Sequence, residues 1–115
     1  MVVDDDESVR ESLEGLLTTI GYHVEVFASA AGFLGSATLT KTECLILDVL
    51  IPGMSGPDLQ QELARRQHAI PIIFITAHGS ESLVTRVLAD GAVDCLLKPF
   101  GEEALINALG KALVR

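Results

Sequence analysis

The sequence predicts an α/β fold, a three-layer αβα sandwich in which helices cover both faces of a five-stranded parallel sheet. Two short runs, Cys44–Leu47 and Ile72–Ile75, are apolar without alternation, as in strands that are buried on both faces. Segments with helical spacing of apolar residues separate the predicted strands, so that strand and helix alternate five times. This strict alternation favours parallel strands joined by right-handed crossovers.

Length and composition limit the kind of protein. The chain has 115 residues, which is the size of one domain. Hydrophobic residues make up 49% of it and aromatic residues only 4%, so we expect an aliphatic core. The formal net charge of -8, without a Lys/Arg cluster, argues against direct binding to nucleic acid or to a membrane surface. No apolar run has the length of a membrane span and the start is acidic by Asp4, so we expect a cytoplasmic location.

The first half of the chain contains three predicted strands and two predicted helices. The strands cover residues 1–3, 23–27 and 43–48. The first of these is so short that we expect one or two of its residues to be missing. Ser8 is the expected N-cap of a helix that stops at Gly21. A short helix opens at Ser29 and ends near Gly35, and residues 38–42 form a polar connector.

The second half of the chain adds two strands and three helices. The strands cover residues 71–76 and 92–97, and the helices cover residues 57–66, 80–91 and 101–115. Pro57 suits the first turn of its helix, because the N–H group that proline lacks has no partner there. Lys98–Pro99 is a sharp break between the last strand and the last helix.

Polar side chains follow four of the five predicted strands directly. They are Asp4 and Asp5, Asp48, Thr76 and Lys98. In open α/β sheets the ligand crevice lies outside the carboxyl ends of the strands, and the flavodoxin-like strand order 2-1-3-4-5 would make these four strands contiguous. The second strand, which contributes no such residue, is then the edge of the sheet. The sequence therefore predicts one site at the carboxyl edge.

The residues of this site predict phosphoryl chemistry. An isolated aspartate at a strand end is more often a cap for the following turn, but three clustered carboxylates repel one another unless a cation lies among them. A few carboxylates with water and a phosphate are typical of a Mg²⁺ site. Lys98 and Thr76 add an ammonium and a hydroxyl group suited to a tetrahedral anion. Asp48 could then be a carboxylate nucleophile that accepts a phosphoryl group.

The same residues resemble the motifs of response-regulator receiver domains in bacterial two-component signalling, over the whole of residues 1–115. That family has an acidic pair after the first strand, an acceptor Asp after the third, Thr/Ser-Ala after the fourth and Lys-Pro-Phe after the fifth. The matching residues here are Asp4-Asp5, Asp48, Thr76-Ala77 and Lys98-Pro99-Phe100. Each motif is weak alone, but together and in this order they are specific.

The resemblance implies roles for the acidic residues. Asp48 would be phosphorylated by the phosphohistidine of a sensor histidine kinase. Asp5 and Asp48 would ligate Mg²⁺ directly, together with the backbone carbonyl of Leu50. Asp4 would hold the ion through water.

The resemblance also implies how the phosphoryl group is bound. Lys98, Thr76 and the backbone N–H of Ala77 would bind its oxygens, and Lys98–Pro99 would be a cis peptide bond. Most of the catalysis would be positioning and neutralisation of charge. Such a domain is not a stand-alone enzyme, but it catalyses its own phosphorylation and dephosphorylation.

The way the signal leaves the site departs from the family pattern at Cys95. Receiver domains usually carry an aromatic residue there, whose rotation accompanies the movement of the Thr76 position. Cys95 has no ring, so the usual coupling between the two switch positions is in question. We expect the output surface on the fourth helix, fifth strand and fifth helix, including parts of residues 83–90 and 102–111. The same face is the expected interface of a phosphorylation-dependent homodimer.

The segments Ile75–Gly79 and Gly91–Asp94 look most like those of regulators with a C-terminal helix-turn-helix domain. The resemblance therefore implies regulation of transcription. We expect the effector domain to be absent from the 115 residues.

Other chemically capable residues are expected to have ordinary structural roles. Asp6 and Glu7 lie in the first turn of the first helix, where acidic side chains interact favourably with the helix dipole. His23 and His68 are expected to be solvated surface residues. Cys44 and Cys95 lie in apolar runs and are expected to be buried and reduced. His78 borders the site, where it is either a surface loop residue or a group that controls access of water to the phosphoryl group.

Two alternative functions are considered. The run Asp4–Ser8 can be read as the Asp-x-Asp pattern of a haloacid-dehalogenase-like phosphatase, but the chain is short for that family and the loop after Asp48 would have no use. A pseudo-receiver that only binds a partner is the second alternative. Such domains typically lose the acids or the lysine, and neither is lost here.

Overall fold

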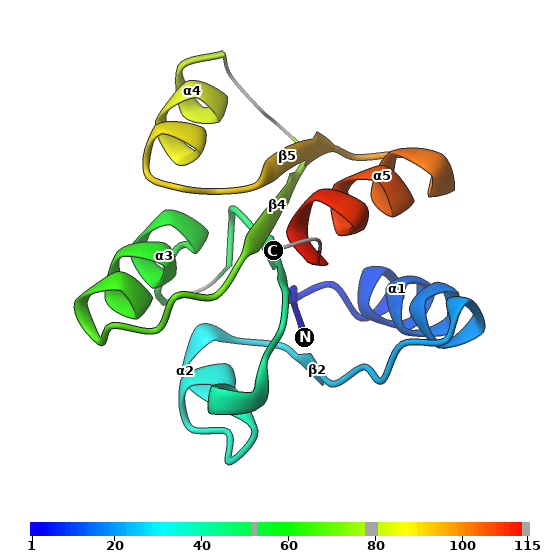
Figure 1. The fold of residues 1–115 in the computed structure, drawn as a ribbon, viewed down its shortest axis with the longest axis horizontal. Coiled ribbons are helices and arrows are strands. Elements are labelled where there is room, and N and C mark those ends of the chain that lie inside the picture. The colour runs from blue at the N-terminus through cyan, green and yellow to red at the C-terminus, as the bar shows by residue number, and fades with distance from the viewer. Residues whose placement is uncertain (52, 78–80, 114–115) are drawn as a thin grey trace.

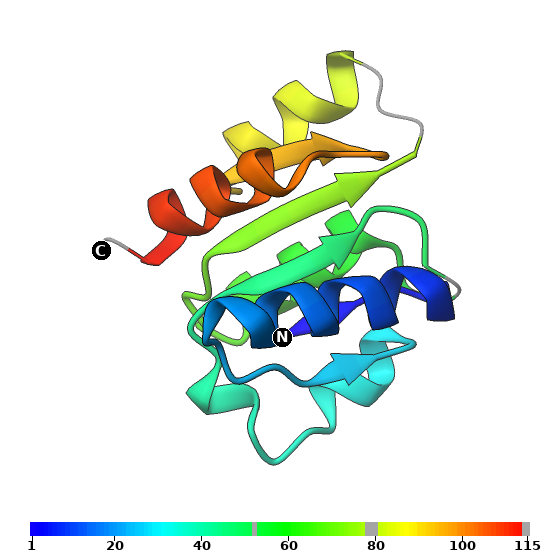
Figure 2. The same cartoon turned by 90° about the vertical axis from the view of Figure 1, so that its right-hand side faces the viewer.

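The computed structural model describes residues 1–51, 53–77 and 81–113, and it contains a five-stranded parallel sheet between two helical layers (Figure 1). The strands are β1 (Val2–Val3), β2 (Val26–Phe27), β3 (Leu45–Asp48), β4 (Ile72–Thr76) and β5 (Asp94–Leu97). Their order in the sheet is β2-β1-β3-β4-β5, which confirms the predicted order. The strand arrows in Figure 2 point the same way, so the carboxyl ends of the strands form one edge.

The helices divide between the two faces of the sheet. They are α1 (Glu7–Ile20), α2 (Ala30–Leu34), α3 (Gly56–Arg65), α4 (Glu81–Ala89) and α5 (Glu102–Leu113), with a short 3-10 helix η1 (Leu39–Lys41) before β3. In Figure 1, α1 and α5 lie on one side of the sheet and α2, α3 and α4 lie on the other. Two buried clusters result, one holding Leu13 and Leu105 and the other Phe33 and Leu59. The sandwich therefore has three layers.

The central strands are buried because they are apolar on both faces. Every residue of β3 and β4 is buried, and alternate side chains of β3 enter opposite clusters, Leu47 on the α3 side and Ile46 on the α1 side. In the register of the sheet, Val3 lies beside Leu47, so the residues that follow, Asp4 and Asp48, emerge level with each other. The register thus aligns the polar residues at the carboxyl edge.

The structure corrects several predicted boundaries. Helix α1 is capped by Asp6 and not by Ser8, because the Asp6 side chain accepts the Ser8 N–H group at 2.9 Å. Strand β2 contains two of the five residues predicted for it, since its partner β1 pairs only through Val2 and Val3. The connector at residues 38–42 includes η1, and the prediction of a helix start at Ser80 lies outside the described residues.

The remaining ordinary residues lie at or near the surface. Cys44 and Cys95 are free thiols that are half-buried, less than we predicted. His23 is exposed as expected, whereas His68 is half-buried. Among the described residues, no helix is both long and apolar enough to cross a membrane.

Candidate functional site

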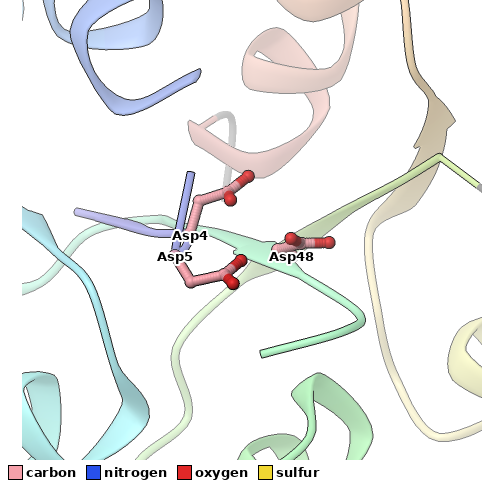
Figure 3. A group of neighbouring side chains, drawn as sticks. All are labelled: Asp4, Asp5 and Asp48. Atoms are coloured by element: carbon pink, nitrogen blue, oxygen red, sulfur yellow. The ribbon is translucent and has the colours of Figure 1, made fainter. Parts of the chain in front are cut away.

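Three carboxylates meet at the carboxyl edge of the sheet (Figure 3). One oxygen each from Asp4, Asp5 and Asp48 lies within 4.8 Å of the others. Asp4 and Asp48 are buried, while Asp5 is exposed and lies on the solvent side. The sequence predicted this grouping, because the residues follow neighbouring parallel strands.

The turn between β1 and α1 holds Asp4 in place. Its Oδ1 atom accepts the backbone N–H of Asp6 at 2.9 Å, and its backbone carbonyl accepts a hydrogen bond from Arg10 Nη1 at 2.8 Å. Asp6 in turn accepts hydrogen bonds from the side chain and backbone of Ser8, which lower the pKa of the Asp6 carboxyl. The turn is therefore fixed by bonds that leave Asp5 free to face solvent.

Arg10 is a residue beside the site that the sequence did not point to. Its guanidinium holds the main chain of the acidic turn from one turn into α1. The available signal was a cation placed between the inward positions Val9 and Leu13, on the border of the buried face of the helix.

Asp48 ends β3 and is 6% exposed. The backbone N–H of Leu50 donates to its Oδ1 atom at 3.3 Å, and the next residue along, Val49, remains bonded to the Ile75 carbonyl at 3.0 Å. Burial, followed by the charge of Asp4, raises the pKa of the Asp48 carboxyl to about 6, although Lys98 and the Leu50 N–H act in the opposite direction. Burial and the neighbouring carboxylate thus disfavour the ionised form of Asp48.

Lys98 supplies a cation to this acidic group. Its Nζ atom lies 2.9 Å from Asp4 Oδ2 and 3.4 Å from Asp48 Oδ2. Burial alone would lower the pKa of Lys98, but the hydrogen bonds and charges of Asp4 and Asp48 raise it overall, so the ammonium stays protonated. The Lys98–Pro99 peptide bond is cis, which confirms the expectation from the family resemblance.

Thr76 is fully buried at the end of β4, and its carbonyl accepts the backbone N–H of Lys98 at 2.8 Å. Ala77, the next residue, is exposed. The predicted phosphate-binding residues therefore come from adjacent strand ends. His78, the expected border of the site, lies outside the described residues.

Cys95 lies farther back on β5, level with Phe74 of β4. It is half-buried against the cluster that includes Val87 of α4, and burial raises the pKa of its thiol. The structure thus puts Cys95 beside the α4 side of the core and not among the carboxylates.

The arrangement brings a carboxylate that is chemically able to act as a nucleophile next to a cation that is able to bind an anion. Three carboxylate oxygens in close proximity suit a hard cation such as Mg²⁺, which prefers oxygen ligands. Lys98 is a protonated donor beside Asp48, in a position to neutralise charge on an incoming phosphoryl group.

Comparison with known proteins gives a consistent family match. The model of the response regulator receiver domain family matches residues 1–110. Nodulation protein W of Bradyrhizobium diazoefficiens is 47% identical over 114 residues, which are 99% of this chain and 50% of that protein. Transcriptional regulatory protein FixJ of Azorhizobium caulinodans is 40% identical over 114 residues, 99% of this chain and 54% of that protein.

A solved structure agrees with this match. That of the response regulator StyR superposes with a TM-score of 0.90 at 46% identity, and the similarity covers 97% of this chain and 57% of that one. The chain spans about half the length of the curated relatives it matches.

Proposed function

Because the chain belongs to the response regulator receiver domain family of two-component signalling, we propose that Asp48 is its phosphoryl acceptor. Receiver domains of two-component regulators are phosphorylated by sensor kinases and generally bind Mg²⁺ at an acidic pocket. The observation that carries the proposal is the meeting of three carboxylates with the ammonium group of Lys98 at one edge of the sheet. Of these carboxylates, only Asp48 ends the central strand β3, and its side chain accepts a hydrogen bond from the backbone N–H of Leu50.

The chain's own donor set fits Mg²⁺. Asp5 and Asp48 would hold the ion directly, together with the backbone carbonyl of Leu50. Asp4 would act through water, because its two carboxylate oxygens accept the Asp6 N–H and Lys98 at 2.9 Å, closer than Asp48 accepts the Leu50 N–H at 3.3 Å and Lys98 at 3.4 Å. When bound, the ion would supply positive charge next to the phosphoryl oxygens.

The proposed reaction transfers a phosphoryl group from a phosphohistidine of a sensor histidine kinase. A carboxylate oxygen of Asp48 forms a bond to phosphorus, and the bond from phosphorus to the donor imidazole nitrogen breaks with its electron pair returning to that nitrogen. Lys98, Thr76 and the Ala77 N–H bind the phosphoryl oxygens. Attack of water on phosphorus later releases inorganic phosphate and restores the Asp48 carboxylate, so the domain resets itself without acting as a stand-alone enzyme.

The proposed output surface is the face formed by α4, β5 and α5, including parts of residues 83–90 and 102–111. Three large apolar side chains are exposed on it: Leu88 at 41%, Leu97 at 54% and Ile106 at 43%. Exposed apolar groups on neighbouring elements favour a protein partner, and a second phosphorylated copy is the partner we propose. We propose no direct contact of this acidic domain with nucleic acid, and a cytoplasmic location.

The proposed switch joins Thr76 to this face through Cys95. A thiol cannot swing as an aromatic ring does, so we propose that the signal passes by repacking of the core between β5 and α4, where Cys95 contacts the cluster of Val87. The output is proposed to be transcription, through a helix-turn-helix effector domain outside these 115 residues. One relative, FixJ, is named a transcriptional regulatory protein.

The comparisons favour neither the haloacid-dehalogenase-like phosphatase nor the pseudo-receiver. The proposal is tested by incubating wild type and Asp48→Asn with acetyl phosphate and Mg²⁺, followed by intact mass and a dimerisation assay. We expect a phosphoryl adduct on the wild type only. An adduct that persists in Asp48→Asn and maps to Asp4 would instead support the phosphatase.

A further inference from the structure

A cavity of about 340 Å³ lies at the amino edge of the sheet, opposite the acidic site. It is formed by the end of α3, the segment that leads into β4 and the residues after α4. Its apolar lining includes Leu63 and Ile70, and its polar lining includes Gln60, His68 and Asp90. This size is at the lower limit for pockets that bind small molecules.

Gln60 is the buried polar residue of this cavity. It is 6% exposed, and its Nε2 atom donates to the backbone carbonyl of Val87 in α4 at 3.2 Å. Among the residues that the structure describes, its Oε1 atom has no hydrogen-bond partner. Exchanging the two atoms by rotation of the amide would put two acceptors face to face, so the orientation is fixed by Val87.

An unpaired buried acceptor is costly, and a donor in the cavity would relieve that cost. Gln60 Oε1 has almost no surface of its own in the cavity, so a ligand would reach it through rotation of the terminal amide torsion, which is soft in glutamine. The cavity therefore has one strong requirement, which is an N–H or O–H donor near Gln60.

Charge near the cavity favours a cation. Asp90 lines it and, within the described part of the chain, makes no ion pair. The basic side chains at the end of α3, Arg65 and Arg66, are both bound to Glu62. The other ionisable residue of the lining is His68, and Arg86 of α4 lies one turn before Asp90. A ligand with positive charge and more than one N–H group could therefore satisfy Gln60 and face Asp90 at once.

We propose that this cavity binds a small ligand made of a planar N–H donor cation, an amidinium or a guanidinium, attached to a compact apolar body. One N–H group donates to Gln60 Oε1, the positive charge faces the Asp90 carboxylate, and the apolar body packs on Leu63 and Ile70. Because the same amide holds α4 through Val87, the only buried residue of that helix, occupancy also acts on α4. That last consequence for signalling rests on the proposed function of the α4 face, whereas the binding itself does not.

The test uses the unphosphorylated 115-residue chain and three ligands of equal shape. Benzamidine carries the cation and the donors, benzamide carries donors without charge, and benzoate carries acceptors only. We expect benzamidine to shift the Gln60 side-chain amide and the Gly91 backbone amide in nitrogen-proton correlation spectra, with benzamide weaker and benzoate without effect. Similar shifts from benzoate, or no shifts from benzamidine at these amides, would overturn the proposal.

Two variants separate the contribution of the hydrogen bond to Gln60 from that of the charge on Asp90. Gln60→Leu keeps the volume and removes the acceptor, and it should weaken benzamidine about fivefold, the effect of one hydrogen bond. Asp90→Asn, at an exposed position, should weaken benzamidine but leave benzamide unchanged, while Asp58→Asn on the far end of α3 alters neither. Should Gln60→Leu fail to fold, the Asp90→Asn result decides: unchanged benzamidine binding contradicts the proposal. None of these outcomes bears on phosphorylation of Asp48, which is measured separately by mass.

Discussion

Lys98 Nζ lies 3.4 Å from Asp48 Oδ2, so the proposed phosphoryl acceptor already has a cationic partner before any phosphoryl group arrives. The same ammonium is 2.9 Å from Asp4. In the metal-free domain Lys98 therefore acts as an internal counter-ion and competes with an added cation for the carboxylates.

This competition predicts the effect of Lys98→Ala on metal binding. Loss of a partly exposed ion pair of about 0.5–1 kcal/mol should tighten Mg²⁺ binding about two- to fivefold, because the carboxylates lose a competitor. Phosphorylation by acetyl phosphate should nevertheless slow, since a group that binds the phosphoryl oxygens is gone. Titration with Mg²⁺ followed by NMR checks the effect on metal binding, and intact mass checks the rate of phosphorylation.

Lys111→Ala, which removes the cation paired with Asp94, is the control and should change neither. Weaker Mg²⁺ binding in Lys98→Ala would contradict the competition.

The raised pKa of Asp48 predicts how stability depends on pH without metal. Below pH 3.8, its ordinary value, Asp48 is protonated in both the folded and unfolded chains and carries no penalty. Between pH 3.8 and about 6 the folded chain binds more protons at this residue, so its contribution to stability falls as pH rises. Above about 6 the full penalty is present.

Asp48→Asn should therefore be more stable than wild type at pH 7.5 in a chelator. We expect about 1–2 kcal/mol, less than the full value of the shift because the mouth of the site is open to water. Urea unfolding of both proteins at pH 3.5 and 7.5 measures the difference, which should shrink at the lower pH. Added Mg²⁺ should reduce the advantage at pH 7.5. An advantage that is the same at both pH values would show that ionisation of Asp48 is not its cause.

The close packing around Gly56, next to Asp48, predicts that a side chain at this position destabilises the domain. A Cβ atom there would lie 2.6 Å from the backbone oxygen of Asp48 and 2.9 Å from the Phe74 ring. Because α3 begins this close to the end of β3, Gly56→Ala should destabilise the domain by about 1–3 kcal/mol.

Gly15→Ala in α1 is the matched control for Gly56→Ala. A Cβ at Gly15 meets nothing within 4 Å, so this variant should stabilise the domain by about 0.5–1 kcal/mol, the difference in helix propensity. Thermal unfolding of both variants checks the prediction. If both substitutions changed the stability of the domain in the same direction, the packing explanation for Gly56 would be wrong.

The proposed output surface on α4, β5 and α5 predicts that a substitution there blocks dimerisation without affecting phosphorylation. Ile106→Glu puts a charge in place of an exposed apolar side chain of α5, so the phosphoryl adduct should form at the wild-type rate while phosphorylation-dependent dimerisation is lost. Ile20→Glu at the end of α1, where the side chain is similarly exposed, should leave both unchanged. Size-exclusion chromatography with light scattering, after treatment with acetyl phosphate, distinguishes the cases. If Ile106→Glu still dimerised, the interface would have to lie on another face of the domain.

The fold could be predicted because its strands are short apolar runs that end at single polar residues. The apolar runs before Asp48 and Thr76 favour central strands, and parallel strands bring such ends to one edge. The cap of α1 could not be predicted to the residue, since Asp6 and Ser8 are both good N-caps and their mutual hydrogen bond decides between them.

The sequence predicted which acidic residues and which lysine come together at the site, but it did not predict the hydrogen bonds of Arg10 and Gln60. Arg10 reaches a backbone carbonyl, which carries no sequence signal, and the partner of Gln60 lies on a helix 27 residues later. The Gln60 contact depends on how α3 and α4 pack together, and no pattern of apolar spacing specifies this.

The bond between Lys98 and Asp4 joins residues 94 positions apart in a chain of 115. The contact requires β5 to be paired in the sheet, because Lys98 follows that strand directly. The complete charge arrangement is therefore absent while β5 is still being synthesised or is unpaired. We therefore expect an incomplete or misfolded copy, which lacks this charge arrangement, to be unable to accept a phosphoryl group at Asp48.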